Sequence, residues 1–105
     1  MILRKEYGFE SAHFIYNHPG TCRNLHGHSY KLFVCIEGAV NPETGMIIDF
    51  DDLSKVVEAR VISRLDHRFL NDLIPLSTAE NISVWIWNEL KPDLPGLVQV
   101  EVYET

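Results

Sequence analysis

The chain has 105 residues and a mass of 12.1 kDa, which is the size of one domain, so we expect a single domain over residues 1–105. Lys and Arg total 9 against 15 Asp and Glu, and the formal charge of −6 argues against a nucleic-acid-binding protein, because an acidic surface repels phosphate backbones. No apolar run approaches the ~20 residues that cross a bilayer, and the first residues have no signal-peptide pattern, so we expect a cytoplasmic protein.

The first half of the chain predicts strands bounded by loops and turns. In the first strand Leu3, Tyr7, Phe9 and His13 share one face, because side chains alternate along a strand. The predicted elements are a strand over 2–13, a loop over 15–25, a strand over 28–37, a turn over 41–45 and a third strand over 46–48. We expect these strands to form an antiparallel sheet.

The second half predicts two helices and a last strand. After Asp49 the apolar period changes to that of a helix, which we expect to end near Leu65. A second helix is predicted to begin at Ser77 or Thr78, where Ser77-Thr78-Ala79-Glu80 fits a capping box, and Pro92 stops that helix. The apolar positions are Leu53, Val56, Val57 and Val61 in the first helix, Ile82, Trp85, Ile86 and Leu90 in the second, and Val98, Val100 and Val102 in a strand over 97–104. The pattern predicts an α+β fold with both helices on one face of the sheet.

Three histidines form the most informative pattern in the sequence. His26 and His28 are two residues apart on a predicted strand, so both imidazoles point the same way. His13 ends the preceding strand, and antiparallel pairing places it beside the start of the next, next to His28. Three imidazoles with an open fourth position are typical of a catalytic zinc site, although iron, nickel and copper also suit imidazole. The alternative is that these are ordinary surface or core histidines.

Cys22 and Cys35 are expected to be reduced thiols, since nothing predicts export. Cys22 lies in the loop before His26 with Arg23 beside it, and nearby positive charge favours the reactive thiolate. It is a candidate fourth metal ligand, a candidate general base, or a loop cysteine without a role. Cys35 lies within a strand and is interpreted as a small apolar filler.

Two further sites have functional and ordinary interpretations. Asp66 follows the first predicted helix and can hold the imidazole of His67 for acid–base work, or the pair can be a helix end and a surface histidine. Glu104 ends an apolar strand face, where its carboxylate either accepts N–H groups of a ligand or simply reaches solvent.

The sequence resembles the 6-pyruvoyl-tetrahydropterin synthase family over essentially its whole length. The matching segments, in family order, are Phe9–His13, Cys22–Tyr30, Thr44–Phe50, Leu65–His67, Thr78–Asn81 with Trp85–Trp87, and Val102–Thr105. The resemblance implies a T-fold, in which an antiparallel sheet is backed by two helices and subunits close into barrels with ligand sites between them. Family members continue with a further strand, whereas this sequence stops at Thr105, so we expect an exposed sheet edge.

The resemblance also implies roles for individual residues. His13, His26 and His28 would hold zinc, and Cys22 would be the general base, with Asp66 and His67 completing a proton relay. Glu104 would anchor a pterin ring in a homo-oligomer, a trimer or a hexamer. Thr78 and Glu80 of a neighbouring subunit would help to bind the pterin, and the candidate triphosphate partners are Arg23, Lys31 and Arg68.

The spacing Cys22-x-x-x-His26-Gly27-His28 is the short form that resembles 6-carboxytetrahydropterin synthase of the queuosine pathway. The implied reaction converts 7,8-dihydroneopterin triphosphate to 6-carboxy-tetrahydropterin, with release of acetaldehyde and triphosphate. The alternatives are a sibling enzyme that makes 6-pyruvoyl-tetrahydropterin or cleaves dihydroneopterin, and a non-catalytic module that binds zinc or pterin.

Overall fold

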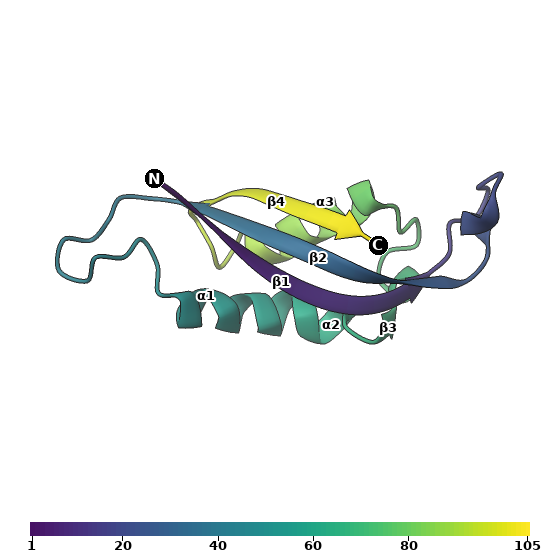
Figure 1. Cartoon of the computed structure of the whole chain (residues 1–105), viewed down its shortest axis with the longest axis horizontal. Coiled ribbons are helices and arrows are strands. Elements are labelled where there is room, and N and C mark those ends of the chain that lie inside the picture. Colours follow the sequence, from purple (N-terminus) through teal and green to yellow (C-terminus); the bar gives the residue numbers. More distant parts are fainter.

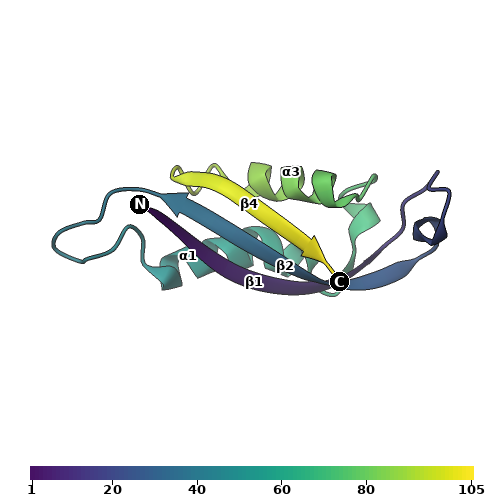
Figure 2. The same ribbon diagram turned by 45° about the horizontal axis from the view of Figure 1, so that its top comes forward.

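The computed structural model describes all 105 residues as one elongated body of 54 × 22 × 21 Å. Its sheet has the strand order β3-β1-β2-β4, and the helices lie on one face of it (Figure 1), an arrangement that the rotated view in Figure 2 also shows. The strands are β1 (Ile2–His13), β2 (His26–Glu37), β3 (Arg68–Phe69) and β4 (Leu97–Glu104), and the helical elements are η1 (Thr21–Arg23), α1 (Phe50–Val57), η2 (Glu58–Ile62), α2 (Ser63–Leu65), η3 (Leu70–Asp72) and α3 (Ala79–Leu90). No helix is long and apolar enough to cross a membrane.

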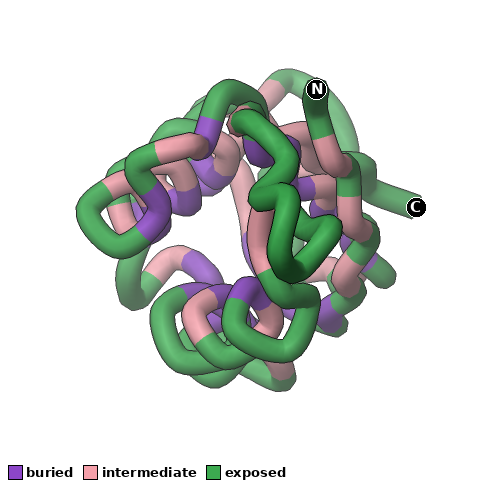
Figure 3. The backbone as a smooth tube through the Cα atoms, turned by 90° about the vertical axis from the view of Figure 1, so that its left-hand side faces the viewer, coloured by how far each residue is buried: buried purple, intermediate pink, exposed green.

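The core lies between the helices and one face of the sheet. Figure 3, a view close to the long axis, shows the buried segments facing the inside of the molecule and the exposed segments forming its outer surface. The β1–β2 ladder pairs Phe9 with Tyr30 and Tyr7 with Leu32, and the β2–β4 ladder pairs Val34 with Val100. Leu32 and Val34 are fully buried, as are Leu53, Val57, Ile82, Ile86 and Leu90 of the helices. The alternation of strand side chains therefore delivers one apolar face to the helices, as predicted.

The first predicted helix is continuous from Phe50 to Leu65, but its middle is wider than an α-helix. Asp49 is the N-cap residue, and its carboxylate accepts the N–H of Asp51 at 2.7 Å. Acidic groups are favourable at this positive end of the helix dipole. Residues Glu58–Ile62 form a π-helical turn, which periodicity did not predict.

The second helix begins one residue later than a capping box at Ser77 would place it. Thr78 is the N-cap residue, and its Oγ1 accepts the N–H of Asn81 at 3.2 Å. Of the two predicted starts, Thr78 is confirmed, whereas the capping box with Glu80 as its third helical residue is wrong, because Ser77 is fully buried and lies before the cap. The helix ends at Leu90, just before Pro92, as predicted.

The predicted third strand over 46–48 is absent. Both sides of β2 are occupied, by β1 and β4, so no edge of β2 remains for this segment. The loop bonds to itself instead, with the N–H of Asn41 donating to Met46 O at 2.9 Å, and Ile47 and Ile48 pack against the core as loop residues. The fourth strand of the sheet is the two-residue β3, which runs parallel to β1 beside Ser11 and Ala12.

The last strand was predicted correctly, but one of its inward residues was not. A register irregularity opposite Cys35 and Ile36 pairs Ile36 with Leu97 and Cys35 with Gln99. Leu97 is therefore buried, whereas Val98, predicted to share the apolar face, is 43% exposed.

Candidate functional site

The three histidines meet where β1 ends and β2 begins. β2 starts at His26, two residues earlier than predicted, and His13 pairs directly with His26, while His28 lies opposite Ser11. Directly paired residues share a face, so the prediction that His13 joins the pair is confirmed, although its direct partner is His26. The ring centroids lie 4.5 Å (His13–His26), 5.1 Å (His13–His28) and 4.8 Å (His26–His28) apart.

Each of the three rings is oriented by a main-chain oxygen. His13 Nδ1 lies 2.8 Å from Ser77 O, His26 Nδ1 lies 2.8 Å from Asn24 O, and His28 Nδ1 lies 2.7 Å from Thr105 O. A carbonyl oxygen only accepts hydrogen bonds, so each Nδ1 carries the proton and donates it. Each Nε2 is then unprotonated and carries the lone pair with which a histidine binds a metal ion.

This donor set fits a metal ion. The three ligand atoms lie within 4.8 Å of one another, whereas two nitrogens bound at about 2.1 Å to one tetrahedral ion are ~3.4 Å apart. Ring rotations that shorten the separations by at most about 1.4 Å would therefore close the site. His13 is fully buried, and that burial lowers its pKa and favours the neutral imidazole that binds metals. No carboxylate or thiol joins the group, which leaves coordination positions open.

Tyr30 and Glu104 extend the site across β2 to β4. Tyr30 lies on the same face as His26 and His28, and its hydroxyl is 3.4 Å from His13 Nε2. Burial, reinforced by the nearby Glu104 carboxylate, raises the pKa of Tyr30 and keeps the hydroxyl protonated. Glu104 is the ladder partner of Tyr30, and its Oε2 lies 3.8 Å from His28 Nε2. Tyr30 was not predicted as a site residue, although the alternation His-x-His-x-Tyr indicates its orientation.

Cys22 lies outside the histidine cluster. It is half-buried in η1, its thiol is free, and its side chain makes no hydrogen bond. The main chain holds the loop in place, since Ile15 N–H donates to Cys22 O at 2.7 Å. In this geometry the thiol is not one of the three clustered donors.

Asp66 and His67 are attached to β1 at Glu10. Asp66 Oδ1 accepts the N–H of Glu10 at 2.9 Å, and the N–H of His67 donates to Glu10 O at 2.6 Å. Asp66 Oδ2 lies 3.0 Å from His67 Nδ1, and His67 has a φ of 55°, an uncommon conformation that these contacts hold. The N–H of Glu10, followed by the His67 side chain, lowers the pKa of Asp66.

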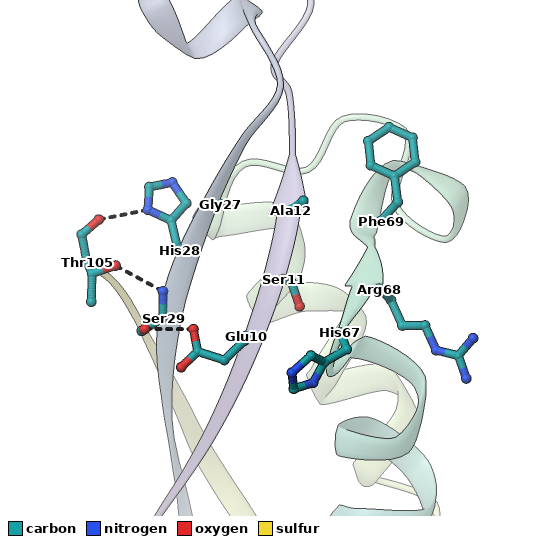
Figure 4. Close-up of a pocket in the computed structure, with 10 residues that line it drawn as sticks. All are labelled: Glu10, Ser11, Ala12, Gly27, His28, Ser29, His67, Arg68, Phe69 and Thr105. Atoms are coloured by element: carbon teal, nitrogen blue, oxygen red, sulfur yellow. Dashed lines mark hydrogen bonds between the residues drawn. The ribbon is translucent and has the colours of Figure 1, made fainter.

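His67 opens onto a surface pocket of about 600 Å³. Figure 4 shows Glu10 between Ser29 and His67, and the Arg68 side chain extending away from β1. The pocket is lined by Glu10, Ser11, Ala12, Gly27, His28, Ser29, His67, Arg68, Phe69 and Thr105. Cys22 is not among these residues, so a single chain does not bring the three residues of the predicted relay together.

Thr78 and Glu80 lie at the start of α3, beside the anchor of His13. The Thr78 hydroxyl is committed to capping the helix, and Glu80 is exposed in the first turn. Because Ser77 O bonds His13, this helix start lies at the same end of the sheet as the histidines. Of the predicted triphosphate partners, Arg68 lines the pocket beside His67, and Arg23 is exposed in η1. Lys31 Nζ lies 3.8 Å from Glu6 Oε1.

The fold and the histidine site define a T-fold protein with a candidate metal centre of three imidazoles. The family model described as 6-pyruvoyl tetrahydropterin synthase matches residues 2–105. The chain belongs to this family of pterin lyases, as its resemblance indicated.

Individual relatives agree with this membership. The chain is 41% identical to a 6-carboxy-5,6,7,8-tetrahydropterin synthase of Synechocystis over 99% of this chain and 86% of that protein. It is 34% identical to a 6-pyruvoyl tetrahydrobiopterin synthase of Dictyostelium discoideum, over 100% of this chain and 90% of that one. The solved 6-pyruvoyl tetrahydropterin synthase of Caenorhabditis elegans superposes with a TM-score of 0.91 at 27% identity, covering 100% and 89% of the two chains. The predicted α+β T-fold is confirmed.

Proposed function

We propose that the chain is a zinc-dependent lyase that converts 7,8-dihydroneopterin triphosphate to 6-carboxy-tetrahydropterin, releasing acetaldehyde and triphosphate. The observation that carries the proposal is the convergence of three Nδ1-anchored imidazoles whose candidate ligand atoms lie within 4.8 Å of one another. The side-chain carbon next to the pterin ring carries one oxygen in the substrate and two in the carboxyl product, so one water enters per turnover.

The carboxy product is favoured by two features. The short spacing between Cys22 and His26 is the form expected for 6-carboxytetrahydropterin synthase. The similarity to the Synechocystis protein extends over 99% of this chain, and a 6-carboxy-5,6,7,8-tetrahydropterin synthase of Haemophilus influenzae is 34% identical over 98% of this chain. The human 6-pyruvoyl tetrahydrobiopterin synthase is also 41% identical, over 82% of this chain, which makes formation of 6-pyruvoyl-tetrahydropterin the second candidate.

In the proposed reaction the protein holds and moves protons around a fixed substrate. His13, His26 and His28 would hold zinc, which when bound supplies a Lewis acid for the side-chain hydroxyls of the substrate. The Glu104 carboxylate, on the same face, accepts the N–H groups of the pterin ring. Thr78 and Glu80 of a neighbouring copy complete the pterin pocket.

Cys22, as thiolate, takes a proton from the substrate side chain, and His67, held by Asp66, returns one. Because Cys22 and the Asp66–His67 pair do not meet within one chain, the relay is assembled between subunits of a homo-oligomer. Two open sheet edges support this assembly: the outer edge of β4 is unpaired, and β3 covers β1 only at Ser11 and Ala12.

A product assay on the zinc-loaded protein tests the proposal. We expect acetaldehyde and triphosphate to appear together with 6-carboxy-tetrahydropterin. Triphosphate with a pyruvoyl product and no acetaldehyde establishes the second candidate, and bound zinc without turnover refutes both.

The assembly of the relay is tested by mixing two inactive variants, Cys22→Ala and His67→Ala, under conditions in which subunits exchange. If the relay crosses subunits, mixed oligomers contain intact sites and recover activity. The control is the double variant Cys22→Ala, His67→Ala at the same total protein concentration, which cannot form an intact site. No recovery from the two single variants contradicts a relay between subunits.

A further inference from the structure

A polar side chain outside the histidine cluster bonds to the two segments that flank His13. Asn71, which lies in η3, contacts the main chain just beyond the end of β1. Its Oδ1 accepts the N–H of Phe14 at 3.0 Å, and its Nδ2 donates to Phe14 O at 2.9 Å. One side-chain amide therefore replaces the strand neighbour that Phe14 lacks, directly after His13.

The same amide also holds the segment that orients the His13 ring. Asn71 Nδ2 donates a second hydrogen bond to Pro75 O at 3.0 Å, and Asn71 Oδ1 accepts one from Ser77 Oγ at 3.3 Å. The Ser77 hydroxyl is also 3.4 Å from Phe14 O, and Ser77 O accepts the His13 Nδ1 proton at 2.8 Å. Ser77 and His13 are both fully buried, so no water replaces these contacts at their centre.

We infer that Asn71 is a positioning residue of the metal centre: it fixes Ser77 O against His13 and thereby sets which ring nitrogen of His13 faces the metal. The inference depends on the proposed function only in assuming that the histidines bind a metal ion. The contacts that join Asn71 to His13 through Ser77 are present in the metal-free chain. A metal-binding histidine that loses the hydrogen-bond partner of its other ring nitrogen typically binds the metal ~10- to 100-fold more weakly. For His13 that partner is Ser77 O, in the residue whose hydroxyl Asn71 holds.

The first test reads the His13 ring directly, without metal. In ¹⁵N-labelled, metal-free protein at a pH at which the imidazoles are neutral, long-range ¹H–¹⁵N spectra distinguish the Nδ1–H from the Nε2–H tautomer. We expect all three rings to be Nδ1–H in the wild type. In Asn71→Ala, His13 becomes a mixture while His26 and His28 stay unchanged, because their carbonyl partners, Asn24 and Thr105, do not touch Asn71.

The second test measures the affinity for zinc by competition with a chromophoric chelator. Asn71→Ala is expected to bind zinc more weakly, by at most ~10- to 100-fold because Ser77 O itself is kept, and its Co²⁺ complex is expected to show altered d–d absorption bands. The matched control is Val34→Ala, which removes buried side-chain volume in the centre of β2 and destabilises the fold without touching the site. It is expected to retain the zinc affinity of the wild type.

The inference is overturned if His13 in Asn71→Ala remains in the Nδ1–H form and the zinc affinity matches that of Val34→Ala. If Asn71→Ala does not fold, Asn71→Asp is measured in its place, since it keeps the acceptor oxygen and replaces the donor nitrogen by a carboxylate oxygen that faces Phe14 O and Pro75 O, and the same two results decide. If the wild type itself binds no zinc, the proposed function fails, while the tautomer measurement still decides the role of Asn71.

Discussion

Replacing Cys22 by alanine separates a proton-transfer role from a metal-binding role. The Cys22 sulfur is not part of the histidine cluster and its side chain makes no hydrogen bond, so Cys22→Ala is expected to retain the full zinc content. The substitution removes a half-buried side chain without polar partners, and the expected loss of stability is below about 1 kcal/mol. Loss of a general base typically lowers kcat by about 10²- to 10⁴-fold. At 1.36 kcal/mol for each factor of ten, this raises the barrier by ~2.7–5.4 kcal/mol.

The assay determines bound zinc per chain and the rate of acetaldehyde release in the same preparations. The matched control is Cys35→Ala, which removes the other thiol from β2, where it is 5% exposed and lies on the sheet face opposite the histidines. We expect Cys35→Ala to leave zinc content and rate unchanged. Loss of zinc together with activity in Cys22→Ala would identify the thiol as a ligand, and an unchanged rate would remove it from the mechanism.

Three further predictions address the metal, the acid limit of stability and the helix start. His26→Ala removes one of the three metal-binding nitrogens. Chelator competition is expected to show zinc binding weakened by more than the ~10- to 100-fold that follows when a ligand histidine loses only its hydrogen-bond partner. Retained affinity would exclude His26 as a ligand. Burial lowers the pKa of His13 below its ordinary value of 6.5, so as the pH falls through 6.5 the unfolded chain takes up a proton before the folded chain does. The free energy of unfolding of the metal-free protein should therefore fall as the pH is lowered from about 7 to about 5, with a shallower slope in His13→Gln by urea denaturation. Thr78→Ala should cost ~1 kcal/mol of stability through loss of the N-cap, whereas Thr78→Ser should cost little; equal losses would show that the cap contributes nothing.

The parts of the molecule that were predictable from sequence have strong local signals. The alternation of β1 and β2 and the helical spacing after Asp49 survive in the structure because one face of each element is buried against the others. The histidine cluster follows from the same alternation, since His26 and His28 share a face and the hairpin returns His13 to their side.

The parts that were not predictable depend on partners far away in the chain. β3 has two residues, too few for a period, and its place is set by the contacts of Asp66 and His67 with Glu10. The segment 46–48 has strand character, but β4 occupies the edge that it would need. The register irregularity between β2 and β4, which turns Leu97 instead of Val98 toward the core, arises from the pairing of the two strands and has no pattern in the sequence of β4 that predicts it.

The anchors of the three rings couple metal capture to the completion of the fold. His26 is hydrogen-bonded to Asn24 O in the adjoining loop. The Ser77 and Thr105 oxygens contact His13 and His28 only after the segment before α3 and the strand β4 have docked. A nascent chain that has formed only the β1–β2 hairpin therefore contains all three histidines but binds a metal ion weakly, because two of the rings are not yet held. Zinc would therefore bind in the last step of folding and stabilise the docked end of β4. Hydrogen exchange in β4 should then be slower in the zinc-loaded protein than in the metal-free protein.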